Sequence, residues 1–66
     1  MGMTNLTNRE NQIMEFISLG FSDKQIARKL KLSKHTVSTH TGNIYRKLRA
    51  QNRAHAVNIL YLKAIS

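Results

Sequence analysis

The side chains that could do chemistry in this sequence gather in one stretch, Lys34–Leu48. This stretch holds hydroxyls, two histidines, an amide and several cations, and it contains no carboxylate. Such groups donate hydrogen bonds to phosphate oxygens and exchange them with the edges of bases. Because the run lacks acid, it favours a polyanionic ligand, above all a nucleic acid.

Other kinds of chemistry have little support. The chain has no cysteine, which excludes disulfides and thiolate metal sites. Its three histidines, His35, His40 and His55, do not show the H-E-x-x-H spacing of a metal-binding helix. No nucleophile stands beside a base in a recognisable pattern, and 66 residues leave little room for a catalytic cleft. The prediction is a protein that is not an enzyme and has neither cofactor nor metal site.

The charge balance agrees with a nucleic-acid partner. Eleven Lys and Arg residues oppose three Asp and Glu residues, for a formal net charge of +8.

No apolar run is long enough to span a membrane, and the first residues lack the apolar core of a signal peptide. We therefore expect a cytoplasmic chain without a membrane partner. Residues 1–5 are predicted to be a disordered N-terminal end, and residues 6–66 a single domain.

Two predicted helices position the acid-free stretch. The first spans Asp23–Leu30 and opens with the capping box Ser22-x-x-Gln25. After a three-residue break, Ser33 can cap a second helix that spans Lys34–Leu48. Two short helices joined in this way are typical of a helix-turn-helix, whose second helix lies in the DNA major groove.

A helix before this pair supplies much of the predicted core. It spans about Asn8–Leu19, opens with the capping box Thr7-x-x-Glu10 and ends at Gly20, which tolerates the left-handed backbone of a helix end. Apolar positions in the first three helices follow helical spacing. The expected core residues are Ile13, Met14, Phe16, Ile17, Ile26, Ala27, Leu30, Val37, Thr41, Ile44 and Leu48.

The last predicted helix carries more apolar surface than one core can cover. It spans about Arg53–Ala64 after Asn52 as N-cap. Ala56, Val57 and Leu60 share one face of this helix. Ile59 and Leu62 point elsewhere. Scattered exposed apolar residues are one interpretation, and a contact with a second copy or a further domain is the other. The predicted dimer interface consists of Val57, Ile59, Leu60 and Leu62.

Several spaced blocks agree in order with a known family. They are Leu6-Thr7-x-Arg9-Glu10, Gly20-x-Ser22-x-Lys24-x-Ile26-Ala27, Leu32-Ser33-x-x-Thr36-Val37-x-x-His40, Asn43-Ile44-x-x-Lys47-Leu48 and Arg53-x-x-Ala56-Val57. Together they resemble the DNA-binding domain of LuxR/FixJ-type bacterial transcription regulators. The resemblance implies an all-α fold of four helices with a central helix-turn-helix. It also implies double-stranded DNA as partner and a fourth helix that forms a homodimer contact.

The resemblance implies further partners as well. Such domains usually follow a receiver or ligand-binding domain in a longer regulator, although stand-alone members exist, and RNA polymerase is a further candidate partner. Bacterial sigma-factor region four is similar in the first half of the chain, so a polymerase-contacting helix-turn-helix is one alternative. A basic amphipathic segment that acts on membranes or RNA is another, but the capping boxes argue against it.

Resemblance and helix geometry together assign roles along the acid-free stretch. Ser38, Thr39 and Gly42 are expected to face the bases, with His35 at the margin. Ser38 and Gly42 stand where the family often has Lys and a long or charged residue, which suggests a different target sequence or weaker direct readout of the bases. Glycine inside a helix costs about 1 kcal/mol, and close approach to DNA and chance drift both remain open as reasons. The expected phosphate contacts are Lys24, Lys34, Thr36, His40, Asn43, Arg46 and Lys47.

Overall fold

The computed structural model describes residues 6–65, and the side chains of residues 6–62. The predicted disordered end, residues 1–5, lies outside the described residues. Within them the chain forms helices joined by short turns, and no β-strand is present. The helices are α1 (Asn8–Ser18), α2 (Asp23–Leu30), α3 (Lys34–Leu48) and α4 (Arg53–Ile65). This arrangement confirms the predicted all-α fold of four helices.

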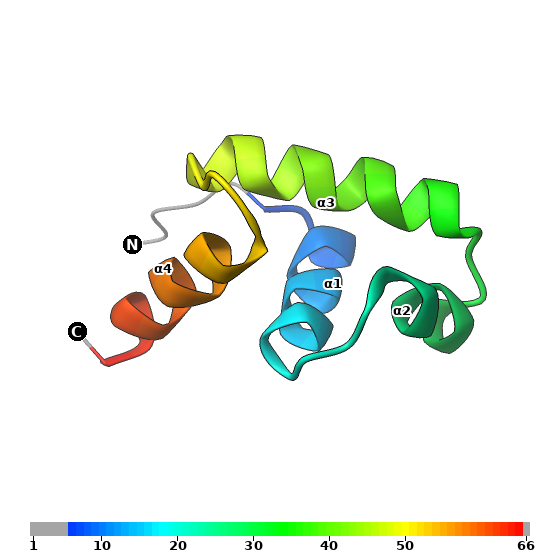
Figure 1. Ribbon diagram of the computed structural model, residues 1–66, viewed down its shortest axis with the longest axis horizontal. Coiled ribbons are helices and arrows are strands. Elements are labelled where there is room, and N and C mark those ends of the chain that lie inside the picture. Colours follow the sequence, from blue (N-terminus) through cyan, green and yellow to red (C-terminus); the bar gives the residue numbers. More distant parts are fainter. Residues whose placement is uncertain (1–5, 66) are drawn as a thin grey trace.

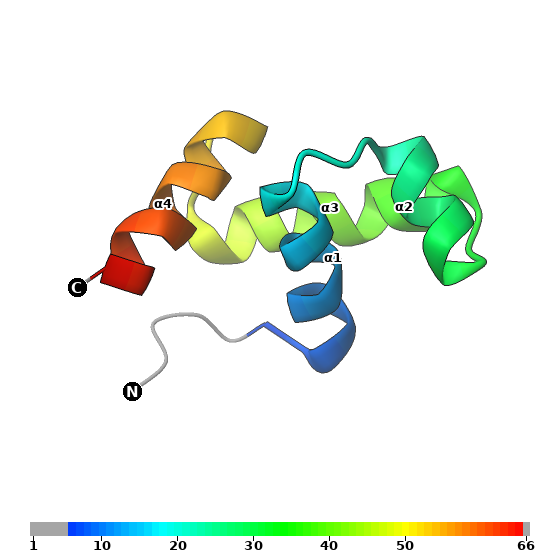
Figure 2. The same ribbon diagram turned by 90° about the horizontal axis from the view of Figure 1, so that it is seen from below.

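The longest helix, α3, packs against all three of the others (Figure 1). Helix α1 also contacts α4, and a view from below shows α1 between α2 and α4 (Figure 2). As a result, one long side of α3 is covered and its opposite side faces outward. No helix within residues 6–65 combines the length and the apolar character needed to cross a membrane.

The predicted helix starts are confirmed in detail. In the first capping box, Thr7 Oγ1 accepts a hydrogen bond from the Glu10 N–H at 3.1 Å, and Glu10 Oε1 accepts one from the Thr7 N–H at 2.9 Å. Ser22 and Gln25 form the same pair of bonds at the start of α2. Ser33 Oγ accepts the Thr36 N–H at 3.0 Å. These side chains satisfy N–H groups that have no partner inside a helix.

The predicted last residues of α2 and α3, Leu30 and Leu48, are confirmed, but the left-handed conformation that follows a helix was foreseen only after α1. Gly20 takes a left-handed φ of 92° after α1, as predicted, and the Phe21 N–H then donates to Phe16 O at 3.0 Å. Helices α2 and α3 end in the same left-handed way, but on Lys31 (φ 58°) and Arg49 (φ 57°). No glycine marks these two ends in the sequence. Cations suit the position electrostatically, because helix carbonyls leave a partial negative charge there.

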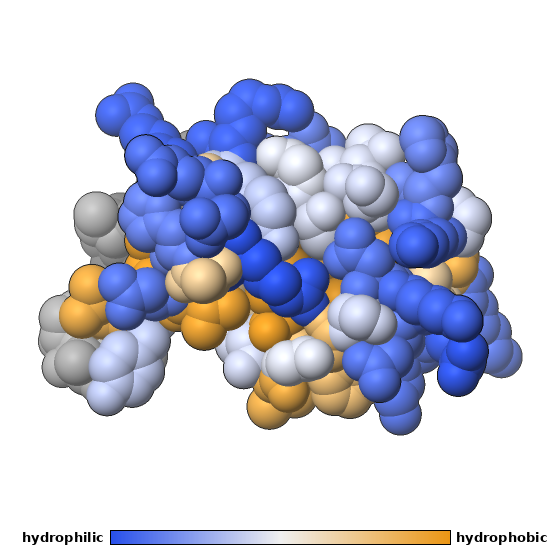
Figure 3. Space-filling model, viewed as in Figure 1, coloured by the Kyte–Doolittle hydropathy of each residue, from blue (hydrophilic) through white to orange (hydrophobic). Residues whose placement is uncertain are grey.

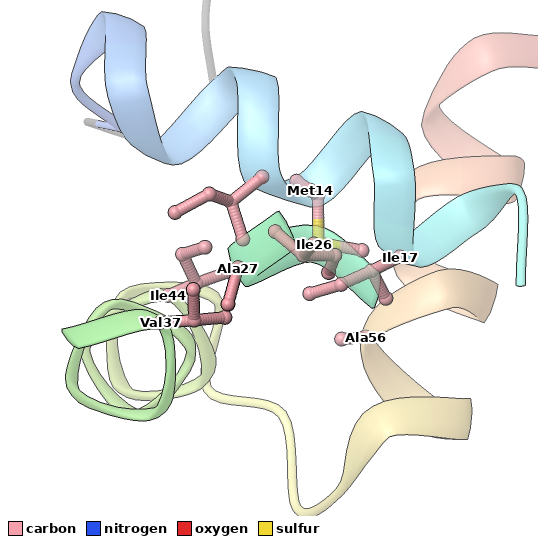
Figure 4. Packing of buried hydrophobic residues seen from close by; sticks show 8 residues of the cluster. Met14, Ile17, Ile26, Ala27, Val37, Ile44 and Ala56 are labelled. Atoms are coloured by element: carbon pink, nitrogen blue, oxygen red, sulfur yellow. The ribbon is translucent and has the colours of Figure 1, made fainter. Parts of the chain in front are cut away.

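The core lies where α1, α2 and α3 meet, with one residue from α4 at its edge (Figure 4). Phe16, Leu30 and Leu48 are only half-buried and pack around this cluster. Thr41 is buried as predicted, and its hydroxyl donates to the Ser38 carbonyl at 2.8 Å, which satisfies its polar group. The buried apolar residues are Ile13, Met14, Ile17, Ile26, Ala27, Val37, Ile44 and Ala56.

Candidate nucleic-acid interface

The covered and the outward sides of α3 differ sharply in chemistry. Val37, Thr41 and Ile44 are buried at three- and four-residue spacing, so they define the side that faces the core. Because a helix turns once in about 3.6 residues, residues 35, 38, 39, 42 and 46 share the opposite side. All of them are exposed. The structure therefore brings the four predicted base-reading residues onto one outward surface.

The outward surface carries only small side chains along the middle of α3. Ser38 is exposed, and its hydroxyl makes no hydrogen bond within the described residues. The Thr39 hydroxyl donates to the His35 carbonyl at 3.1 Å, so its oxygen lone pairs and methyl group remain available to a ligand. A Cβ on Gly42 would meet no atom within 4 Å. Nothing in the described chain therefore requires glycine at this position.

The predicted phosphate-contacting residues fall into two groups. Lys24, Lys34 and Arg46 are exposed cations, and Arg46 Nη2 also donates to Asn43 Oδ1 at 2.7 Å. Thr36 is half-buried, and its Oγ1 accepts the Ser33 hydroxyl at 2.8 Å as part of the cap. His40 is half-buried between the outward side and the core. The exposed cations lie near both ends of the outward surface of α3, and the half-buried groups lie along its flank.

Lys47 has a structural contact that sequence reasoning missed. Its Nζ lies 2.7 Å from Oε1 of Glu10 on α1, whose side chain is only 6% exposed. The Lys47 ammonium and then the Thr7 N–H lower the pKa of Glu10 below its ordinary value of 4.5, against the effect of burial. The pair joins the last turn of α3 to the first turn of α1. One signal was present in the sequence, since a chain with three acids and eleven cations offers every acid several partners.

A second ion pair joins α4 to α2. Arg53 Nη1 lies 3.5 Å from Oδ1 of Asp23, at the start of each helix. The two residues line a shallow cleft of about 430 Å³ together with Lys24, Lys34 and the turn 20–22. Sequence reasoning included both lysines but not Arg53. The cleft adjoins the first residue of α3, so it continues the basic side of the candidate interface.

The outer surface of α4 keeps part of its apolar excess. Among the predicted interface residues, Val57 and Leu60 pack against the core cluster, and Ile59 is half-buried. Leu62 is 53% exposed, and Tyr61, which was not predicted, is 62% exposed. Among the described side chains of α4, the surplus apolar surface is therefore concentrated at residues 61 and 62.

Comparison with known proteins identifies the family to which this domain belongs. The family model described as "Bacterial regulatory proteins, luxR family" matches residues 4–60. The chain belongs to the LuxR family. This domain is the DNA-binding part of LuxR-type transcription regulators, and its helix-turn-helix is the α2–α3 pair described above.

Individual LuxR-family relatives support this placement. The CsgBAC operon transcriptional regulatory protein of Escherichia coli K12 is 42% identical over 53 residues, which are 80% of this chain and 24% of that protein. The HTH-type transcriptional regulator MalT of Vibrio cholerae is 46% identical over 52 residues, 79% of this chain and 6% of that protein. The chain thus spans a quarter or less of the length of these relatives.

A solved structure supports the fold of the LuxR-family domain. The crystal structure of the response regulator ChrA, of a heme-sensing two-component system, superposes with a TM-score of 0.85 at 33% sequence identity. The match covers all of this chain and 33% of ChrA.

Proposed function

We propose that this LuxR-family domain binds double-stranded DNA in a sequence-specific manner, with α3 in the major groove. The observation that carries the proposal is the outward surface of α3, which is exposed, free of acid and opposite the buried seam. Ser38 and Thr39 read base edges, Gly42 faces the bases, and His35 contacts the margin of the site. Because the Thr39 hydroxyl hydrogen is already used by the His35 carbonyl, Thr39 accepts a hydrogen bond from a base or touches a thymine methyl group.

The phosphate contacts position this helix. Lys24, Lys34 and Arg46 contribute charge, since they are exposed and lie beside or beyond the base-reading residues. Thr36, His40 and Asn43 contribute neutral contacts along the flank. Lys47 belongs to the proposed set as well, but its ammonium already binds Glu10, so its removal affects the fold in addition to DNA binding.

The proposal includes a homodimer on DNA with two half-sites. The exposed apolar residues on α4 support it, and Tyr61 joins the predicted contact of Val57, Ile59, Leu60 and Leu62. An upstream receiver or ligand-binding domain and RNA polymerase are further proposed partners, and the cytoplasm is the proposed location. The chain matches only a small part of its relatives, which is consistent with a regulator that has additional domains.

Selection of bound duplexes from a random pool tests the main proposal, followed by binding measurements at several salt concentrations. We expect log K to fall by about 0.9 for each phosphate neutralised. Thr39→Ala is expected to cost roughly 1–3 kcal/mol on the selected site and less on scrambled DNA. Arg46→Gln is expected to weaken binding to both duplexes alike. It should also reduce the salt slope by the contribution of about one phosphate.

The matched control is Lys29→Gln, which removes a cation that lies over the Phe21 ring, away from α3. Lys29→Gln should leave the salt slope nearly unchanged. Two outcomes contradict the proposal. One is the absence of any preferred duplex after selection, and the other is an equal loss on both duplexes for Thr39→Ala.

A further inference from the structure

The cleft between the starts of α2 and α4 has an excess of positive charge. Lys24, Lys34 and Arg53 line it, and Asp23 is the one carboxylate among its lining residues. In Figure 3, long hydrophilic side chains cross the face of the molecule between α4 and α2. Three cations against one anion leave a net charge of +2, which attracts an anionic group.

Arg53 is poorly satisfied in this cleft. Its contact with Asp23 is 3.5 Å long, and its Nη2 is buried without a hydrogen-bond partner. Its side chain is 36% exposed, so the guanidinium can turn toward a ligand at the surface. A guanidinium normally forms two parallel hydrogen bonds with a carboxylate or phosphate. Arg53 has the charge and the spare donor that such a contact needs.

The start of α2 supplies two further donors to the same cleft. Ser22 and Gln25 cap each other, so their N–H groups are used. The N–H groups of Asp23 and Lys24 donate to no atom within residues 6–65. Free N–H groups at a helix start favour anions, because they point outward along the positive end of the helix dipole.

We propose that Arg53, together with Lys24 and Lys34, binds one phosphate of the DNA backbone, and that Asp23 holds Arg53 in the free protein. The inference rests on the proposed function, because the cleft adjoins Lys34 at the start of the groove-binding helix. On DNA, the phosphate replaces the Asp23 carboxylate and gives the unpaired Nη2 a partner. Asp23 therefore competes with DNA, and it lowers the affinity of the domain for any duplex.

Binding of a random-sequence duplex and of the selected site, at several salt concentrations, tests this inference. Arg53→Gln is expected to reduce the salt slope by about 0.9 on both duplexes, whereas Arg53→Lys keeps most of the slope. Asp23→Asn is expected to tighten binding by roughly two- to fivefold, the size typical of an exposed ion pair. Arg53→Gln should cost more in the Asp23→Asn background, because the phosphate then has no competitor for the guanidinium.

Two matched variants control for charge alone. Glu15→Gln removes an exposed acid outside the cleft, and Lys29→Gln removes an exposed cation outside it. Asp23→Asn must tighten binding clearly more than Glu15→Gln does, a comparison that stands even if Arg53→Gln does not fold. A thermal unfolding curve for each variant shows which are folded.

The inference is overturned if folded Arg53→Gln keeps the wild-type salt slope, or if Asp23→Asn and Glu15→Gln act alike. If the ion pair between Arg53 and Asp23 is purely structural, these substitutions change the thermal stability and leave the salt slope unchanged. If the unchanged protein itself shows no salt-dependent duplex binding, the proposed function fails instead.

Discussion

Replacing Glu10 by Gln tests how α3 is held against α1. Glu10 accepts the Thr7 N–H at 2.9 Å and also binds Lys47 at 2.7 Å. Glutamine preserves the first contact, because Gln25 accepts the Ser22 N–H at the same distance in the second capping box. The substitution therefore removes the negative charge and leaves the helix cap in place.

The expected cost follows from the burial of the two groups. A hydrogen bond to a charged group contributes about 1.5–3 kcal/mol, and the Glu10 side chain is only 6% exposed. The Lys47 side chain is 34% exposed, which shifts the estimate toward the roughly 0.2–1 kcal/mol of a surface pair. We expect a loss of about 1–2 kcal/mol in the free energy of unfolding. For a domain of this size the melting temperature then falls by roughly 5–15 °C.

The dependence on pH gives a second readout. Because the folded-state pKa of Glu10 is lowered from 4.5, its contribution is fully present above that value and is lost as the pH falls through the folded-state pKa. The difference in unfolding free energy between wild type and Glu10→Gln should be full at pH 7 and should shrink in acid below pH 4.5.

Thermal and urea unfolding followed by circular dichroism provides the measurement, with exposed Glu15→Gln as the control. Lys47→Met is expected to cost more than Glu10→Gln, because it leaves a buried carboxylate without its cation. Equal stability of Glu10→Gln and wild type at pH 7 would refute this reasoning. So would a difference that stays constant into acid.

Three further predictions concern other parts of the domain. Gly42→Ala should stabilise the fold by about 1 kcal/mol in thermal unfolding, since no atom lies within 4 Å of the new Cβ. If close approach to DNA is the reason for the glycine, the same variant should bind the selected site more weakly. Equal or tighter binding would indicate that the glycine is there by chance. Lys31→Gly should stabilise α2 by roughly 0.5–1 kcal/mol, because it relieves a left-handed backbone, and a less stable variant in urea unfolding would contradict this. Leu62→Glu should leave the melting temperature nearly unchanged and abolish cooperative binding to two half-sites, whereas Leu60→Glu should destabilise the core. Sedimentation that shows unchanged self-association for Leu62→Glu would exclude this part of α4 from the dimer contact.

The local features of the domain could be predicted from the sequence. The limits of α2 and α3 are as expected, and their starts follow from Ser22 and Ser33, which cap N–H groups only three residues away. The buried side of α3 follows from the spacing of Val37, Thr41 and Ile44, since a helix repeats every 3.6 residues. Helix α4 extends to Ile65, one residue beyond its expected end, where no capping residue marks a boundary.

The long-range contacts of charged residues could not be predicted in this way. Lys47 and Glu10 are 37 positions apart, and Arg53 and Asp23 are 30 apart. Their pairing depends on how α1 and α4 cross the helix-turn-helix, and that crossing depends on side-chain packing throughout the core. The exposure of Tyr61 and Leu62 depends on the same packing, because periodicity alone does not show where α1 stops covering α4.

The sequence by itself determined the helices, their caps, the buried seam and the acid-free surface of α3, since each depends on residues within about one helical turn. Only the tertiary structure decided which cations already have partners. It joined Lys47 to a buried carboxylate and Arg53 to Asp23, and it left Lys34 exposed. The physical reason is that an ion pair needs its two groups within about 4 Å, and only the packing of the helices sets that distance for residues far apart in the chain.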